Sequence, residues 1–326
     1  EFGLRSNNYM QHKLINVTNT SNPTSGFLLT KQSQDISSGI RVTLWLKTSQ
    51  GAVKLEVNNE SAVFFVEQSQ AQEAKQILLS RNVKLEKSES LSLKTFNQQK
   101  VHGFYFRYLR DFYAARECLK LSGIKCYEDD IRVDERYLME RFVYGAVEFV
   151  APALNSESKN NEPLIDTIEN VQIRPCEYRT TFSSLSIDIE CNENEELFSI
   201  ALSGDGLNIV ILVCPPGFSK HQLNEAKEIP YQLIVVESER ELLNTFFTHI
   251  TTFDPDIILG WNVKQFDMAV LARRTKANNL NFNIGRRSRE ASVRQWEDQT
   301  LVDVPGRCVI DGIEALKTMT YQFESY

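Results

Sequence analysis

The first third of the chain shows the alternation of apolar and polar residues that is typical of β-strands. Apolar side chains occupy every second position over residues 42–46 and again over 53–57, on either side of a turn at Gly51. A further apolar run spans residues 62–66. Because side chains two apart on a strand point to the same face, this pattern predicts several short strands within residues 26–66.

A strand, a helix and a second strand are predicted to follow. Residues 103–108 form an aromatic-rich strand, and residues 110–121 have the apolar spacing of a helix. Gly123 stands where a helix C-cap commonly needs a left-handed residue, and a strand is predicted after it at residues 124–127. Two more helices are predicted at residues 71–79 and 135–142. The first domain is therefore expected to mix helices and strands.

The polar stretch at residues 153–163 marks either a loop near a domain boundary or a loop within a hairpin. Residues 1–25 are polar with little apolar periodicity, which predicts a tag or a flexible N-terminal extension. A chain of 326 residues is long enough for about two domains. We expect an N-terminal domain over residues 26–155 and a second domain over residues 156–326.

The second domain has a distinctive order of elements. Ser203-Gly-Asp-Gly206 is a hairpin turn, and Ser238 with Glu241 forms a capping box that starts a helix, which Asp254-Pro255 ends. Strands are predicted at residues 185–191, 197–202, 208–213, 256–260 and 307–311, and a second helix at 264–276. Three strands in a meander, then helix, strand, helix and strand, is the order of a ribonuclease-H-like fold. The chain is thus predicted to be an α/β protein of mixed α+β type.

The composition is that of a globular protein and argues against membrane-spanning and zinc-binding classes. The chain is 42% hydrophobic and 24% charged, as in ordinary globular proteins, and its formal net charge of −7 argues against a surface that grips duplex nucleic acid throughout. Without a run of about 18 apolar residues, no transmembrane helix is expected. The six cysteines form no CxxC pair and no zinc-ligand spacing with histidine, so we expect reduced thiols of a cytoplasmic protein and no structural zinc.

The sharpest local feature is the strand Ser184-Leu-Ser-Ile-Asp-Ile-Glu190. Alternate side chains share a face, so Asp188 and Glu190 point the same way, about 6.6 Å apart along the strand. Two carboxylates at that spacing can hold a divalent cation between them, and without a cation they repel each other. The alternative is an ordinary strand whose polar face lies in water.

A second feature lies between a strand and a helix. Asn262 follows the strand predicted at residues 256–260, and Asp267 falls in the first turn of the next helix. Catalytic groups of open α/β sheets lie beyond the carboxyl ends of the strands. The alternative for Asp267 is an acid that only complements the helix dipole.

Together the two features resemble the first two exonuclease motifs of family-B DNA polymerases. Those motifs are Asp-x-Glu on a strand and Asn-x-x-x-Phe-Asp after a later strand, here with Phe266 before Asp267. The Asp-Pro-Asp lead-in at residues 254–256 is also typical of the family. The resemblance extends from about residue 26 to 326 and is to the bacterial DNA polymerase II type. The segments that carry this closer resemblance are residues 26–30, 135–142 and 307–316.

The resemblance implies a 3′→5′ proofreading exonuclease within a DNA-directed DNA polymerase. It assigns Asp188, Glu190 and Asp267 as catalytic, metal-binding carboxylates, and Asn262 and Phe266 as contacts of the 3′-terminal nucleotide. It implies two divalent ions, Mg²⁺ or Mn²⁺, and release of deoxynucleoside monophosphates. The implied partners are a single-stranded 3′ end, primer–template DNA, the polymerase domains of the same protein and a sliding clamp, in the bacterial cytoplasm with the nucleoid.

One part of the family pattern is not found. The third exonuclease motif is Tyr-x-x-x-Asp, but Tyr321 is followed four positions later by Ser325. We therefore expect an exonuclease domain that is incomplete at its C-terminus, truncated before its last motif, and inactive on its own. Asp298, Asp303 and Asp311 are expected to be surface or turn residues.

Two other functions stay open at this point. A stand-alone ribonuclease-H-like nuclease would need its last carboxylate within the chain. A non-catalytic template-binding module would use the N-terminal domain. The aromatic residues at 104–108, with Arg107 and Arg110, could stack on single-stranded template or could belong to the core.

Overall fold

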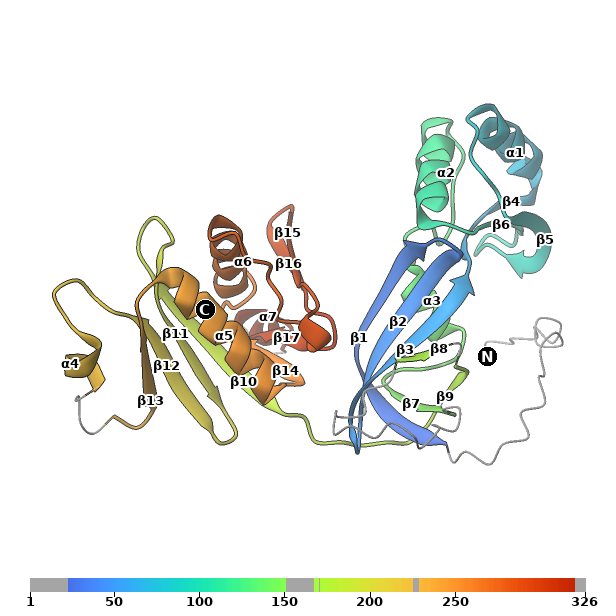
Figure 1. The fold of residues 1–326 in the computed structure, drawn as a ribbon. Helices are drawn as coiled ribbons and strands as arrows, with labels where there is room; N and C mark the ends of the chain where they lie inside the picture. Colours follow the sequence, from blue (N-terminus) through green and yellow to red (C-terminus); the bar gives the residue numbers. More distant parts are fainter. Residues whose placement is uncertain (1–22, 151–166, 170, 225–228, 320–326) are drawn as a thin grey trace.

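A computed structural model describes residues 23–150, 167–169, 171–224 and 229–319. The strands of this part form two six-stranded sheets, a three-stranded sheet and a two-stranded sheet (Figure 1). The loop predicted at residues 153–163 lies outside the described residues, as does all but the end of the extension predicted over residues 1–25. No helix of the described part is long and apolar enough to cross a membrane.

The first six-stranded sheet has the order β8-β3-β2-β1-β7-β9. Tight turns at Gly39 and Gly51, where φ is +139° and +118°, join its three long antiparallel strands. The strands are β1 (Thr24–Ile36), β2 (Gly39–Thr48), β3 (Gly51–Glu60), β7 (Ala146–Phe149), β8 (Thr167–Glu169) and β9 (Ile173–Pro175). Since β1 already begins at Thr24, the strand region starts slightly earlier than the sequence predicted.

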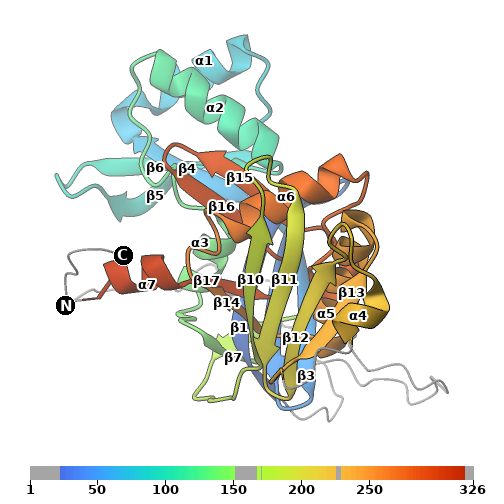
Figure 2. The same cartoon turned by 90° about the vertical axis from the view of Figure 1, so that its left-hand side faces the viewer.

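A smaller sheet, in the order β4-β6-β5, branches from the first one. Helices α1 and α2 lie on it (Figure 2) and share a core with it that includes Phe64, Phe104 and Phe106. The prediction of a strand at residues 124–127 is wrong, because only Tyr127 pairs, in a single bridge to Phe65. The elements are β4 (Ala62–Glu67), η1 (Gln68–Gln70), α1 (Ala71–Ser80), β5 (Lys87–Lys94), β6 (Lys100–Phe106), α2 (Leu109–Leu121) and α3 (Val133–Met139).

The second six-stranded sheet has the order β13-β12-β11-β10-β14-β17. Its strands are β10 (Ser184–Cys191), β11 (Leu197–Gly204), β12 (Leu207–Val213), β13 (Gln232–Val236), β14 (Ile257–Gly260) and β17 (Cys308–Asp311). β10, β11 and β12 form an antiparallel meander, and β14 and β17 add to β10 in parallel (Figure 2). The predicted ribonuclease-H-like order is therefore present. β13 is an additional strand that the sequence pattern did not predict.

Helices and a hairpin complete this part of the molecule. α5 begins as predicted, because the Ser238 hydroxyl accepts a hydrogen bond from the Glu241 amide, and it ends at Asp254, which is left-handed with φ +51°. α6 begins at Asp267 rather than 264, because residues 262–266 form a separate turn. The elements are α4 (Lys220–Asn224), α5 (Glu239–Phe253), α6 (Asp267–Ala277), η2 (Arg286–Ser288), β15 (Ser292–Trp296), β16 (Gln299–Asp303) and α7 (Gly312–Lys317).

The first sheet contacts the loops that precede β14 and β17 of the second sheet. Lys47 on β2 forms an ion pair with Asp256, which precedes β14, at 2.7 Å, and the Gly306 amide donates to the Thr30 hydroxyl on β1 at 2.9 Å. A Cβ atom on Gly306 would lie 3.0 Å from the ring of Trp45, which is buried. This contact requires glycine at position 306, where φ is +82°.

The chain leaves the first sheet later than the domain division expected after residue 155. β8 and β9 pair with β3 and β7, and the second sheet begins only at Ser184. We therefore propose that the division between the two domains lies between Pro175 and Ser184.

Candidate active site

Strand β10 carries the first pair of candidate residues. Leu185, Ile187 and Ile189 are buried, whereas Asp188 and Glu190 are exposed on the opposite face. The buried face packs into a core that includes residues of α5 and α6. Burial of one face thus fixes the strand so that both carboxylates point away from the core.

Asp267 opens helix α6 and lies close to β10. Its carboxylate is 1% exposed and accepts a hydrogen bond from the Ile189 amide at 3.1 Å. Burial raises its pKa to about 6, and the negative charges of Asp188 and Asp311 act in the same direction against the backbone amides that lower it. Asp188 and Asp267 therefore concentrate negative charge beside the same segment of β10.

The turn before α6 positions the remaining candidates. Asn262 is left-handed, with φ +59°, and its carbonyl accepts the Phe266 amide at 3.0 Å. A Cβ atom on Gly260 would lie 2.6 Å from Val263, so only glycine allows the chain to turn this closely. Phe266 is 42% exposed, so its ring is accessible for contact with a ligand.

Three of the candidate residues lie toward the same end of the second sheet. β10 and β14 run parallel, so Asp188, Glu190 and Asn262 all lie toward the carboxyl ends of neighbouring strands. Within the described residues, however, no three His, Cys, Asp or Glu side chains are placed to hold a metal ion. The structure therefore brings Asp188 and Asp267 near each other, with Glu190 on the same face, but does not gather the three into a ligand cluster.

The donor set still fits a hard divalent cation. All three side chains offer carboxylate oxygens, which suit Mg²⁺ or Mn²⁺. The raised pKa of Asp267, due to burial and then to Asp188, shows that negative charge is held there at a cost that a cation would offset. Asp188, Glu190 and Asp267 are thus chemically suited to such an ion.

The expectation for Asp311 is wrong. This residue is 2% exposed at the end of β17, where its carboxylate accepts the Lys264 amide and caps α7. Asp298 is exposed as expected, and Asp303 is partly buried at the end of β16. The spacing of Asp311 and Glu314, an acidic N-cap with Glu three residues later, was the sequence signal of this role.

The aromatic residues at 104–108 divide between the two faces of β6. Phe104 and Phe106 are fully buried in the core, as one of the two interpretations predicted, while Tyr105 lies on the other face beneath the Lys87 ammonium, 4.3 Å from the ring centre.

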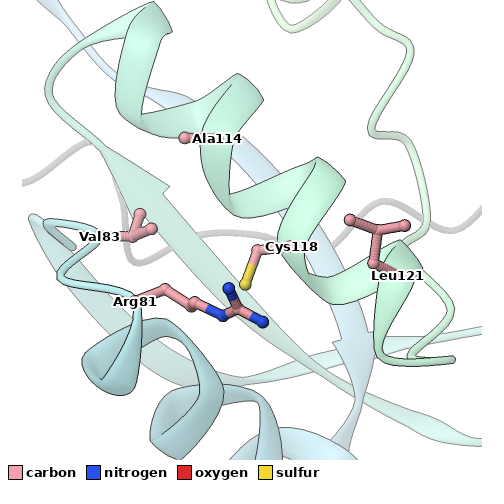
Figure 3. Close-up of a pocket in the computed structure, with 5 residues that line it drawn as sticks. All are labelled: Arg81, Val83, Ala114, Cys118 and Leu121. Atoms are coloured by element: carbon pink, nitrogen blue, oxygen red, sulfur yellow. The ribbon is translucent and has the colours of Figure 1, made fainter.

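A separate pocket of about 280 Å³ lies against α2, where Arg81 extends along Cys118 (Figure 3). No carboxylate lines this pocket, so it is not a candidate metal site.

Comparison with known proteins decides the family. The family model for the exonuclease domain of family-B DNA polymerases matches residues 124–326, more than half of the chain. The chain belongs to the family-B DNA polymerases. The resemblance inferred from the Asp188 and Asp267 motifs is thereby confirmed at the level of the family.

Other similarities agree with this family. A model for the N-terminal part of DNA polymerase II matches residues 26–60. DNA polymerase II of Escherichia coli is 33% identical over 307 residues, which are 93% of this chain and 37% of that protein. A DNA polymerase of Thermococcus sp. (strain 9oN-7) is 23% identical and matches 81% of this chain and 31% of its own length. The chain thus spans about a third of these relatives.

A solved structure supports the fold. The family-B DNA polymerase of Pyrobaculum calidifontis superposes with a TM-score of 0.68, at 21% identity, over 90% of this chain and 37% of that one. The α/β class and the ribonuclease-H-like fold of the second domain are therefore confirmed.

Asp267→Asn is expected to stabilise the metal-free chain by about 1–2 kcal/mol at pH 7.5. Asparagine keeps an oxygen for the Ile189 amide but carries no charge to bury. The folded pKa of about 6 lies above the ordinary value of 3.8, so the cost of ionising Asp267 is absent below pH 3.8, grows up to about pH 6 and is constant above it. Urea unfolding with EDTA should show the gain at pH 7.5 and little of it at pH 4.

Glu190→Gln is the matched control, because it also neutralises a carboxylate, but an exposed one, on the face of β10 that carries Asp188. We expect it to change the free energy of unfolding by less than about 0.5 kcal/mol. Equal stability of wild type and Asp267→Asn at both pH values would contradict the electrostatic account of Asp267.

Proposed function

We propose that this chain is the N-terminal and exonuclease region of a DNA-directed DNA polymerase of the bacterial DNA polymerase II type, and that its second domain removes nucleotides one at a time from a DNA 3′ end. The observation that carries the proposal is the crowding of Asp188 and Asp267 at the carboxyl edge of the sheet. Membership of the family supports it.

In this proposal Asp188, Glu190 and Asp267 hold Mg²⁺ or Mn²⁺. When bound, such ions would supply activation of a water for attack on the phosphodiester and stabilisation of the leaving 3′ oxygen. The Ile189 amide fixes one oxygen of Asp267, so α6 cannot shift along β10 without breaking that bond. The two elements that carry the carboxylates are thus held together before any ligand binds.

Asn262 and Phe266 are proposed to hold the 3′-terminal nucleotide. The exposed Phe266 ring can stack on a base or sugar, and the Asn262 amide can donate to or accept from the nucleotide. Stacking tolerates every base, which a proofreading site requires because any nucleotide can be misincorporated. The partners proposed from the family are primer–template DNA, the polymerase domains of the same protein and a sliding clamp, in the cytoplasm with the nucleoid.

The proposal is tested on the polymerase that carries this chain. With Mg²⁺ or Mn²⁺, a single-stranded oligonucleotide labelled at its 3′ end should release its label as a mononucleotide, while a 5′ label should appear in a ladder of shortened strands. EDTA should stop both reactions. Equal digestion by the isolated 326-residue chain would favour a stand-alone nuclease, and binding of DNA without any digestion would favour a non-catalytic module.

A further inference from the structure

Asp311 connects the strand end of β17 to the turn that precedes α6. Its Cα pairs with that of Gly260 at the ends of the parallel strands β17 and β14. One carboxylate oxygen, Oδ2, accepts the Lys264 amide at 2.9 Å. The other, Oδ1, accepts the Ile313 amide at 2.9 Å and the Glu314 amide at 3.4 Å, which caps α7.

The turn that Asp311 holds is the segment of residues 261–266, which contains Asn262 and Phe266. Asn262 adopts the left-handed conformation, which asparagine tolerates better than most non-glycine residues but which still costs energy, and contacts around the turn offset that cost. Inside the turn the Phe266 amide bonds the Asn262 carbonyl. From outside, Asp311 is the group that holds its backbone at Lys264, while Gln265 is tied through its side chain to Thr300.

The next residue packs against the same turn. A Cβ atom on Gly312 would lie 3.0 Å from the Trp261 ring, so the junction of β17 and α7 lies directly against the first residue of the segment. The junction therefore contacts the turn at two points, by packing at Trp261 and by a hydrogen bond at Lys264.

The geometry points to Asp311 as a positioning residue of the 3′→5′ exonuclease: it sets the conformation of residues 261–266, so that Asn262 and Phe266 meet the 3′-terminal nucleotide. This inference rests on the proposed function.

Asp311→Asn separates the two tasks of the side chain. Asparagine is a good helix N-cap, so its oxygen can still accept the Ile313 amide. Its amide nitrogen would then face the Lys264 N–H, where a donor meets a donor and the hydrogen bond is lost. Asp311→Ser is the second variant, because serine also caps helices but is too short to bond both α7 and Lys264.

The direct readout is hydrogen exchange of the metal-free chain in the absence of DNA. Both variants should accelerate exchange in peptides covering residues 261–266 at least about 10-fold, and leave α5 and the first sheet unchanged. Lys264→Met and Glu314→Gln are the controls, because each removes the 2.6 Å ion pair between these side chains but leaves the Lys264 amide bonded to Asp311. Both controls should exchange like the wild type.

The second readout is digestion of a single-stranded oligodeoxynucleotide by the polymerase that carries the chain. Asp311→Asn should lower kcat/KM about 10- to 100-fold, mostly through KM, because a misplaced turn weakens the grip on the terminal nucleotide. Glu314→Gln, which lies outside the turn, should keep the wild-type kcat/KM.

Two outcomes of the exchange experiment would overturn the inference. One is unchanged exchange at residues 261–266 in both Asp311 variants, and the other is loss of protection throughout the domain, which would make Asp311 a general stabilising residue. A turn that loosens locally while KM stays at the wild-type value would also overturn it. Failure of the proposed function gives a different result, because a wild-type polymerase that digests no DNA leaves the exchange experiment unaffected.

Discussion

Asp188→Ala combined with Glu190→Ala is expected to reduce 3′→5′ digestion by more than about 100-fold in the polymerase that carries this chain. Changes to residues that only support metal ligands already cost about 10- to 100-fold, and this double variant removes two of the three proposed ligands. Both side chains are exposed on the outer face of β10, so the fold should be retained. Release of mononucleotides from a 3′-labelled strand measures the loss.

Ser186→Ala is the matched control for that experiment. Ser186 lies on the same exposed face of β10, two residues before Asp188, and offers no carboxylate. Digestion should be unchanged in this variant, and primer extension should be largely intact in both. If the double variant digests DNA at the wild-type rate, or loses extension and digestion together while folded, the assignment of these carboxylates is wrong.

The second large effect is expected at Asp256, which precedes β14 and contacts Lys47 on β2. Its buried carboxylate accepts hydrogen bonds from the Lys47 ammonium at 2.7 Å, the Arg286 guanidinium at 2.6 Å and the Ser183 amide at 3.0 Å. Asp256→Ala would remove this partner from the buried Arg286 guanidinium and from Lys47, whose side chain is 21% exposed. We expect the free energy of unfolding to fall by about 3–5 kcal/mol.

This carboxylate also makes stability depend on pH. Burial alone would raise its pKa, but the hydrogen bonds from Lys47, Arg286 and Ser183 outweigh burial and hold the pKa below the ordinary value of 3.8. A group with a depressed pKa stabilises the fold above its unfolded pKa, and this contribution is lost as the pH falls through the folded value. The difference between wild type and Asp256→Ala should therefore be full at pH 7 and shrink below about pH 4.

Urea unfolding followed by tryptophan fluorescence measures both effects. Asp298→Ala is the control, because that side chain is exposed in the turn between β15 and β16 and should change stability by less than about 0.5 kcal/mol. A loss below about 1 kcal/mol for Asp256→Ala would show that the ion pairs of Asp256 contribute little.

In strand β10, sequence periodicity alone predicted which face each side chain occupies. The period of two along residues 184–190 was enough to place Asp188 and Glu190 on one face, because burying Leu185, Ile187 and Ile189 leaves no other choice. The same reasoning predicted β11 and β12, whose pairing is local and closed by a short turn.

Non-local pairing limited the prediction elsewhere. β13 was missed because its apolar run is short, and it forms a strand only by pairing in parallel with β12. The hairpin of β15 and β16 was missed because residues 294–296 are exposed without regular alternation. Residues 124–127 failed in the opposite sense, since their apolar pattern was strand-like but only Tyr127 found a partner.

The chemistry of the site depended on burial, which the sequence does not display. Asp267 could be placed at a helix start, yet an acid there is usually exposed, and only the fold reveals its pKa of about 6. Asp311 was misjudged for the same reason. Two of its backbone partners, Ile313 and Glu314, are local, but Lys264 approaches only through the pairing of β14 with β17.

The return of the chain to the first sheet affects the order in which the protein can fold. β8 lies parallel to β3, with Lys54 opposite Thr167, and β9 pairs with β7 as the outermost strand on the other side. On the ribosome, β1, β2 and β3 can associate as soon as they emerge. The strands that pair with both edges of their sheet are synthesised much later. Such distant pairings close slowly. During synthesis the open edges of β3 and β7 are therefore exposed to strands of other chains, which makes this sheet, rather than the one with the candidate active site, the place where misassembly should begin.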